Sequence, residues 1–322
     1  MPRARLCGRS CPVIRAPVVV FGGSGFLGGA IVRRLAQDGA AVRIAVRTPS
    51  AQEAAALRQL PGVEAVAADV RDEGAVGRAL EGAGAAVNAV SLYVESRHAS
   101  FEDIHVEGAR RVASMAMSLG LHRLVLVSGI GSDPASPSSY AAARGRGEEA
   151  VRQVFPAATI LRPSAMIGPG DALVGGLARM VRRAPVVPLF GDGSSRVQPV
   201  HRDDVAAAAA AALARDDARG RCYELGGPCV YRYRELIGLV ERALGLRRPH
   251  LPIPFALWRA GAALARLVGA APITADQIEL VRRDNIVASD APGFAELGLR
   301  PRDTGRAIAE MLRGPQAGGV TH

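Results

Sequence analysis

The chain has 322 residues, of which 49% are hydrophobic and 22% are charged, so it has the composition of a globular protein rather than of a disordered or fibrous one. Its formal net charge is +10, and all 40 of its Lys and Arg positions are arginine, because the sequence contains no lysine. The arginines are scattered singly or in pairs, and only 4% of the residues are aromatic, which leaves no basic run or stacking platform. We therefore expect no nucleic-acid partner.

The first segment, residues 1–16, is basic and lacks the apolar run of a secretory signal. We expect a frayed N-terminal tail there, with a transit peptide as the alternative. The cysteines are too few and too unevenly spaced for a disulfide framework or a zinc clip, and the histidines show no metal-binding spacing, so we expect no metal. The cysteines are Cys7, Cys11, Cys222 and Cys229.

The strongest local pattern lies at residues 18–28, which read VVVFGGSGFLG. An apolar run of strand length meets a Gly-x-x-Gly-x-x-Gly turn, and an amphipathic helix pattern follows. Glycines let the backbone N–H groups at a helix N-terminus approach a pyrophosphate closely. The turn predicts a dinucleotide site, with a glycine-rich structural turn as the alternative. The candidate cofactor-binding residues are Gly22, Ser24, Gly25, Phe26, Leu27 and Gly28.

A second strand is expected at 40–47, and it ends on Arg47. Many NAD-binding folds place an acidic residue here to bind the adenine ribose 2′-hydroxyl. A guanidinium instead suits a 2′-phosphate, so Arg47 favours NADP(H) over NAD(H). The alternative is a surface arginine without a ligand.

Strand and helix patterns then alternate along the chain, with strands expected at 63–70, 85–91, 121–130 and 158–168. This alternation predicts an α/β fold with a Rossmann-type doubly wound parallel sheet. Polar residues at the strand ends would line the cofactor crevice, and Asp69 could meet the adenine edge. The other strand-end candidates are Asn88, Ser91 and Ser128.

Beyond about residue 165 the alternation weakens, and Gly, Pro and Arg increase. We expect the Rossmann domain to span 17–165, with sheet and helix contributions from about 197–225. A smaller α+β C-terminal substrate lobe would be built from 166–196 and 226–315. Within 197–225, seven consecutive alanines follow the Asp203-Asp204 pair, which predicts a slim helix that these aspartates cap and that packs close to the sheet.

The longest apolar stretch, 254–272, is interrupted by Arg259 and Arg266, so the sequence predicts no transmembrane segment. We expect a helix there that covers the core of the second lobe. An amphipathic helix that contacts a membrane surface or a partner is the alternative.

Together these motifs resemble the extended and atypical short-chain dehydrogenase/reductase superfamily over nearly the whole chain. The motifs are GGSGFLG (22–28), Asp69-Val70, Asn88, LVLVS (124–128), Tyr140, LRPSAMIGPGD (161–171) and VQPVHRDDVA (197–206). Residues 87–133 and 274–287 are similar to one branch, the complex I 39-kDa-subunit-like proteins and their bacterial relatives. The resemblance implies that Val70 and Pro163 also contact the cofactor.

The superfamily's chemistry uses a tyrosine that exchanges a proton with the substrate and a lysine four residues later that lowers the pKa of that tyrosine. The resemblance places these roles on Tyr140 and Arg144, which would also bind the cofactor. Arginine keeps the charge but has a larger planar head, so the substitution suggests relaxed chemistry. Ser128, the candidate catalytic hydroxyl, is one step from the expected position.

The resemblance and these residues together imply two alternative functions. The first is an NAD(P)H-binding protein with a structural, sensing or weak redox role, cytoplasmic or peripheral to a membrane, and docked on a membrane-associated protein complex. The second is an active NAD(P)-dependent reductase, epimerase or dehydratase that uses Tyr140 on a carbonyl, quinone-related or sugar-nucleotide substrate.

Overall fold

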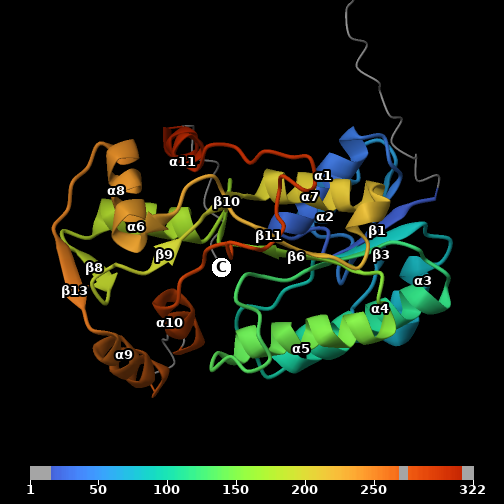
Figure 1. Ribbon diagram of the computed structural model, residues 1–322, viewed down its shortest axis with the longest axis horizontal. Coiled ribbons are helices and arrows are strands. Elements are labelled where there is room, and N and C mark those ends of the chain that lie inside the picture. Colours follow the sequence, from blue (N-terminus) through green and yellow to red (C-terminus); the bar gives the residue numbers. More distant parts are fainter. Residues whose placement is uncertain (1–15, 268–274, 314–322) are drawn as a thin grey trace, which may run out of the picture.

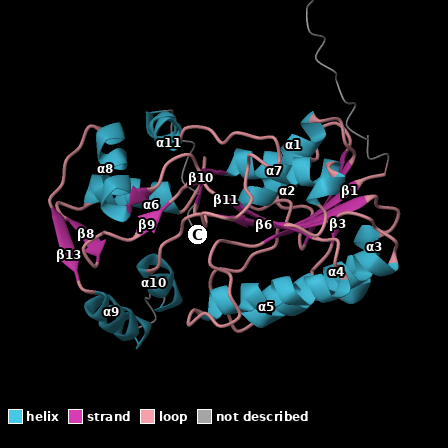
Figure 2. Cartoon of the chain, in the orientation of Figure 1, coloured by secondary structure: helices cyan, strands magenta, loops and turns pink. Residues whose placement is uncertain are grey.

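The computed structural model describes residues 16–267 and 275–313, with the side chains of 263–267 and 275 left out. Its centre is a seven-stranded parallel sheet with the strand order β11-β6-β5-β4-β1-β2-β3 (Figures 1 and 2). The strands are short runs of mostly apolar residues. They are β1 (Val18–Phe21), β2 (Val42–Val46), β3 (Val63–Ala67), β4 (Ala85–Asn88), β5 (Leu124–Val127), β6 (Thr159–Pro163) and β11 (Cys222–Leu225).

All seven strands are parallel, but the order in which they are added to the sheet reverses between β1 and β4. The strands β2 and β3 lie on one side of β1, whereas β4, β5 and β6 lie on its other side. In such sheets ligands bind at the carboxyl ends of the strands, at this switch point. The predicted doubly wound α/β fold is confirmed.

Helices cover both faces of the sheet (Figure 1). One face carries α1 (Phe26–Gln37), α2 (Gln52–Leu57) and α7 (Arg202–Ala214). The other carries α3 (Glu73–Leu80), α4 (Ala109–Ser118) and α5 (Ser139–Val154), with the π-helical turn η1 (Glu102–Gly108) leading into α4. Each face has its own apolar core, because the strands bury side chains on both sides.

The alanine-rich helix α7 packs against α1 and the sheet, as predicted. Small side chains allow this close approach. The prediction that Asp203 and Asp204 cap the helix is wrong, because α7 begins at Arg202 and His201 is its N-cap. The Nδ1 atom of His201 accepts the backbone N–H of Asp203 at 3.2 Å. The two aspartates lie in the first turn, where their negative charges interact favourably with the positive end of the helix dipole.

The remaining elements form a second body beside the sheet, with its own apolar core (Figure 1). They are β7 (Met166–Ile167), α6 (Leu173–Arg183), β8 (Val187–Phe190), β9 (Arg196–Val197), β10 (Val200–His201), β12 (Tyr231–Arg232), α8 (Tyr233–Leu244), β13 (His250–Ile253), α9 (Phe255–Leu267), α10 (Ala275–Arg282) and α11 (Thr304–Arg313). The short turn η2 (Asp216–Ala218) belongs with the main sheet, because it leads into β11. The residue boundaries of the two predicted domains remain a proposal.

Helix α9 occupies the longest apolar stretch of the sequence. Trp258 packs on Phe190 with ring centroids 4.4 Å apart and donates a hydrogen bond to Leu189 O at 3.0 Å, so this side chain holds α9 against β8, whereas Leu257 is 62% exposed. That α9 covers the second apolar core stays a prediction. Within the two described ranges, no helix is long and apolar enough to cross a membrane. Residues 1–15 of the predicted tail, with Cys7 and Cys11, lie outside the described ranges. Cys222 and Cys229 are free thiols.

Candidate functional site

The glycine turn joins β1 to α1 and has a backbone that only glycine fits well. Gly22 adopts a φ of +72°, in the left-handed region. A Cβ at Gly28 would overlap the Gly22 carbonyl oxygen and lie 2.9 Å from the Cα of Gly23. Gly25 is the N-cap of α1, so the first N–H groups of the helix keep no intrahelical partner. These N–H groups and the positive end of the helix dipole make an anion site.

The turn opens on a cavity of about 880 Å³ above the carboxyl ends of the strands. Most of the residues predicted from the sequence line it together. They are Gly22, Ser24, Gly25, Phe26, Leu27, Gly28, Arg47, Asp69, Val70, Ser91, Ser128, Tyr140, Arg144 and Pro163.

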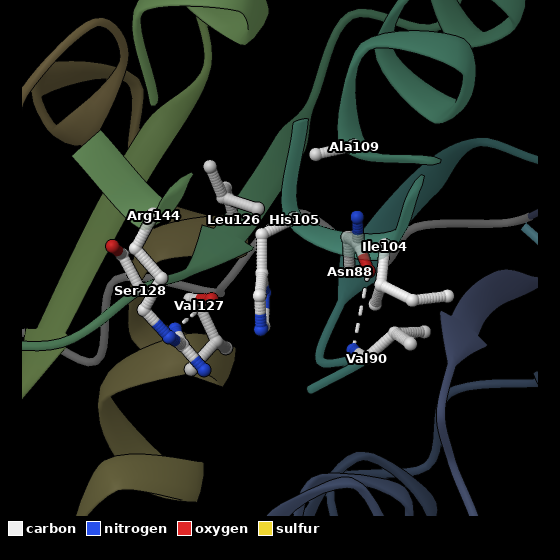
Figure 3. A pocket seen from close by; sticks show the side chains of 9 residues that line it. All are labelled: Asn88, Val90, Ile104, His105, Ala109, Leu126, Val127, Ser128 and Arg144. Carbon is white, nitrogen blue, oxygen red and sulfur yellow. Dashed lines mark hydrogen bonds between the residues drawn. The ribbon is translucent and has the colours of Figure 1, made fainter. Parts of the chain in front are cut away.

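Asn88 is placed differently. It is 4% exposed, and its side-chain oxygen accepts the backbone N–H of Val90 at 3.2 Å (Figure 3). It borders a small cavity beneath the main one, together with His105, rather than the main cavity itself. Asn88 therefore shapes the loop after β4 and supports the cavity floor.

Three charged side chains, those of Arg47, Asp69 and Arg71, line the end of the cavity formed by β2 and β3. Arg47 is exposed directly after β2. Asp69 accepts hydrogen bonds from the Arg71 guanidinium at 2.6 Å, and this contact lowers the pKa of the Asp69 carboxyl. Because Asp69 already has a cationic partner, Arg47 is left available to an anionic ligand.

Tyr140 lies at the opposite end of the cavity, in the first turn of α5, and three other aromatic rings pack against its ring. Tyr93 stacks on it at a centroid distance of 5.7 Å, and Phe101 and His105 meet it edge-on at 5.6 and 5.4 Å. Burial raises the pKa of the Tyr140 phenol, although the nearby Arg144 charge opposes the shift. The phenol is therefore protonated at neutral pH. Burial also lowers the pKa of His105 to about 3, so its ring is neutral.

Arg144 lies one turn further along α5 and is 7% exposed. Its guanidinium sits 5.0 Å from the centroid of the Tyr140 ring and donates to Val127 O at 3.2 Å and to Ser91 Oγ at 2.7 Å. Neither of these two partners carries a compensating charge. Its Nε is buried and has no hydrogen-bond partner among the described residues. Figure 3 shows the Arg144 side chain lying beside Ser128 and Val127.

The Ser128 hydroxyl lies 3.0 Å from the Ser132 hydroxyl, which itself donates to Gly129 O at 2.8 Å. The Ser132 proton is thereby used, so Ser128 donates to Ser132. The Ser128 proton is therefore engaged by Ser132.

Sequence reasoning missed Tyr93 and Arg71 as neighbours of the site. Tyr93 lies in the loop after β4, and no periodic pattern in the sequence ties that loop to α5. Arg71 follows Asp69 by two residues, and such a local pair is visible in the sequence, although its geometry is not.

Residues 18–226 match the family model described as the NAD dependent epimerase/dehydratase family. The chain belongs to this family. It is also 33% identical, over 93% of its length and 78% of the relative's, to the protein of Arabidopsis thaliana named NADH dehydrogenase [ubiquinone] 1 alpha subcomplex subunit 9, mitochondrial. The predicted resemblance to the short-chain dehydrogenase/reductase superfamily and its complex I branch is confirmed.

Two further relatives extend the comparison. The chain is 37% identical to the ceramide reductase of Caulobacter vibrioides over 60% of this chain and 59% of that protein. The crystal structure of an NADPH-dependent quinone oxidoreductase from Escherichia coli, complexed with NADPH, superposes with a TM-score of 0.75 at 20% identity, covering 92% of this chain and 100% of that one. At this identity the superposition concerns the fold alone.

Proposed function

We propose that this chain is an NAD(P)H-binding protein of the atypical short-chain dehydrogenase/reductase type, with a structural, sensing or weak redox role. One observation carries the proposal. The glycine turn, with no room for a Cβ at Gly28, points the uncapped N-terminus of α1 into the large cavity. The N–H groups after Gly25 would hold the pyrophosphate, and Asp69 and Val70 would border the adenine. A bound nicotinamide dinucleotide supplies hydride chemistry.

The Tyr140 end supports binding more strongly than turnover. In the superfamily a lysine ammonium lowers the pKa of the catalytic tyrosine, whereas here burial dominates and the pKa of Tyr140 is raised. The Arg144 head is fixed by Val127 and Ser91, and the Ser128 proton is held by Ser132. We propose that Arg144 and Pro163 border the nicotinamide half, and that Arg144 offers its positive charge to the bound dinucleotide.

The Arg47 side chain leads us to propose NADP(H) as the preferred dinucleotide. In Arg47→Glu we expect NADPH to bind at least about tenfold more weakly, because a carboxylate would face the 2′-phosphate, while NADH affinity changes little. Fluorescence titration with both nucleotides measures this. The matched control is Arg58→Glu, an exposed arginine that does not line the cavity. Equal losses for NADPH and NADH would contradict the assignment of Arg47 to the 2′-phosphate.

A second candidate function is an NAD(P)-dependent reductase, which the position of Tyr140 in the cavity favours. A phenol that lines the cavity can donate its proton to a carbonyl oxygen as hydride arrives at the carbon. The similarity to a protein named ceramide reductase also supports a reductase.

For this second function we expect Tyr140→Phe to lower the rate of NADPH oxidation with an aldehyde or ketone substrate by about a hundredfold or more, because the proton donor is removed. NADPH affinity should change little, since the ring packing on Phe101 is kept. Tyr93→Phe, the stacking neighbour, is the matched control and should keep the rate. An unchanged rate in Tyr140→Phe would remove Tyr140 from the mechanism.

The Arabidopsis relative's name makes it a mitochondrial NADH dehydrogenase subunit. We propose that this chain likewise associates with a membrane-bound protein complex, as a peripheral member on the cytoplasmic side. Recovery with washed membranes and release by high salt without detergent would support this. Recovery in the soluble fraction alone, after gentle lysis of the source cells, would contradict it.

A further inference from the structure

The main cavity continues beyond Tyr140 and Pro163 into the second body of the molecule. There its wall combines polar residues with a group of aliphatic side chains from five different elements, β7, α6, β9, α8 and α10. The polar residues are Ser164, Asp171, Ser195, Arg196, Tyr233, Gln277, Arg283 and Asn285. The aliphatic residues are Met166, Leu173, Val197, Leu236, Leu280 and Val281. We call these six residues the aliphatic chamber. Such a wall gains free energy by covering apolar ligand surface.

The chamber's charged neighbours are already engaged. Asp171 accepts the backbone N–H groups of Val174 at 2.6 Å and Gly168 at 3.2 Å, so it serves as a helix cap. Arg196 binds both oxygens of Asp284, through its backbone N–H and its guanidinium.

Two more polar groups bordering the chamber are engaged in the same way. Arg283 faces Glu279 at 3.5 Å. The Asn285 side-chain oxygen accepts hydrogen bonds from Ser164 Oγ at 2.6 Å and from the Ala165 N–H at 2.8 Å. A sugar nucleotide would bring a diphosphate that needs cations free to pair with it. Arg196 already pairs with Asp284, whereas Arg283 shares the Glu279 carboxylate with Arg259 and Arg282, so competition by a sugar nucleotide is part of the test.

We propose that the aliphatic chamber binds the long hydrocarbon chain of an amphiphilic lipid, whose polar head lies toward Tyr140 and Arg144. This deepens the proposed function, on which it rests, because the lipid would share the cavity with the dinucleotide. The chain lies against the six aliphatic residues and its head meets the polar junction between the two halves. Bound in this way, the lipid is either the ligand whose presence the dinucleotide-bound protein senses or the substrate of the reductase.

The test uses the full chain and a fluorescent long-chain fatty acid as the probe, titrated with and without NADPH. We expect saturable binding with one probe per chain. Leu280→Arg should weaken it at least about tenfold, because a charged side chain would enter the apolar wall. Leu257→Arg is the matched control, since Leu257 is exposed on the adjacent helix α9 and outside the chamber. Leu173→Arg, on the facing helix α6, is a second variant in case Leu280→Arg fails to fold.

NADPH affinity, measured in the same samples, separates this proposal from the previous one. Probe binding that is lost in Leu280→Arg while NADPH affinity is kept supports the chamber. Probe binding in a protein that does not bind NADPH would sink the dinucleotide proposal and leave the chamber standing. A protein that binds NADPH but not the probe would overturn the chamber, as would displacement of the probe by UDP-glucose or equal weakening in Leu257→Arg.

Discussion

Gly28→Ala is expected to abolish dinucleotide binding, while Gly29→Ala, one residue further along α1, leaves it intact. A Cβ at Gly28 would lie 2.8 Å from the Gly22 carbonyl carbon and overlap its oxygen, and both are backbone atoms that cannot turn aside. The turn would have to open, which moves the N–H groups after Gly25 out of position. A Cβ at Gly29 would make only ordinary van der Waals contacts, with the flexible end of Arg33 at 3.5 Å, Gly23 O at 3.7 Å and Leu57 Cδ1 at 3.8 Å.

We expect Gly28→Ala to weaken NADPH binding about a hundredfold or more and to destabilise the fold by about 1–3 kcal/mol, as overpacking does. Gly29→Ala should be neutral or slightly stabilising, because alanine favours a helix interior. Fluorescence titration and thermal melting of both variants measure these effects. If Gly28→Ala melts lower but binds NADPH like the wild type, the turn is structural and the dinucleotide lies elsewhere.

Arg144→Met is expected to weaken NADPH binding while it leaves the free energy of unfolding nearly unchanged. The variant loses hydrogen bonds to Val127 O and Ser91 Oγ, which are worth about 1 kcal/mol or somewhat more each. It also removes a buried charge whose partners are neutral and whose Nε is unpaired, and such a charge is costly. These terms oppose each other, so the unfolding free energy without ligand should change by no more than about 1 kcal/mol.

NADPH binding in Arg144→Met should nevertheless fall about tenfold or more, because the positive charge at the nicotinamide half is gone. Arg146→Met is the matched control, two residues along α5, where the side chain is exposed and pairs with Glu102. Chemical denaturation and nucleotide titration on both variants provide the comparison. A large loss of stability with unchanged NADPH affinity would show that Arg144 is only a structural anchor.

The parts of the site that the sequence predicts are those set by local chemistry. The glycine turn could be predicted because Gly22 and Gly28 are required by backbone geometry, and the parallel sheet because its strands are nearly continuous apolar runs. That Arg47 would follow β2 at the cavity edge follows from the same strand pattern. A strand end brings its last residue to the crevice, but the direction of that side chain depends on the pleat. Asn88 consequently turns into the floor instead of the cavity.

What escaped prediction depends on contacts between distant segments. Tyr93 and His105 reach Tyr140 because the loop after β4 and the π-helical turn fold against α5, and neither position follows from periodicity. The proton arrangement of Ser128 depends on Ser132 in a tight turn. The capping of α7 by His201 was missed because aspartate is the commoner cap.

The most direct test of the dinucleotide proposal is to load the purified protein with NADPH, pass it through a desalting column and identify the retained nucleotide by mass spectrometry. Stoichiometric NADPH, unchanged after incubation with aldehyde and ketone substrates, is the predicted result. Its absence from the protein, with NADH and NADPH equally excluded, would contradict the account.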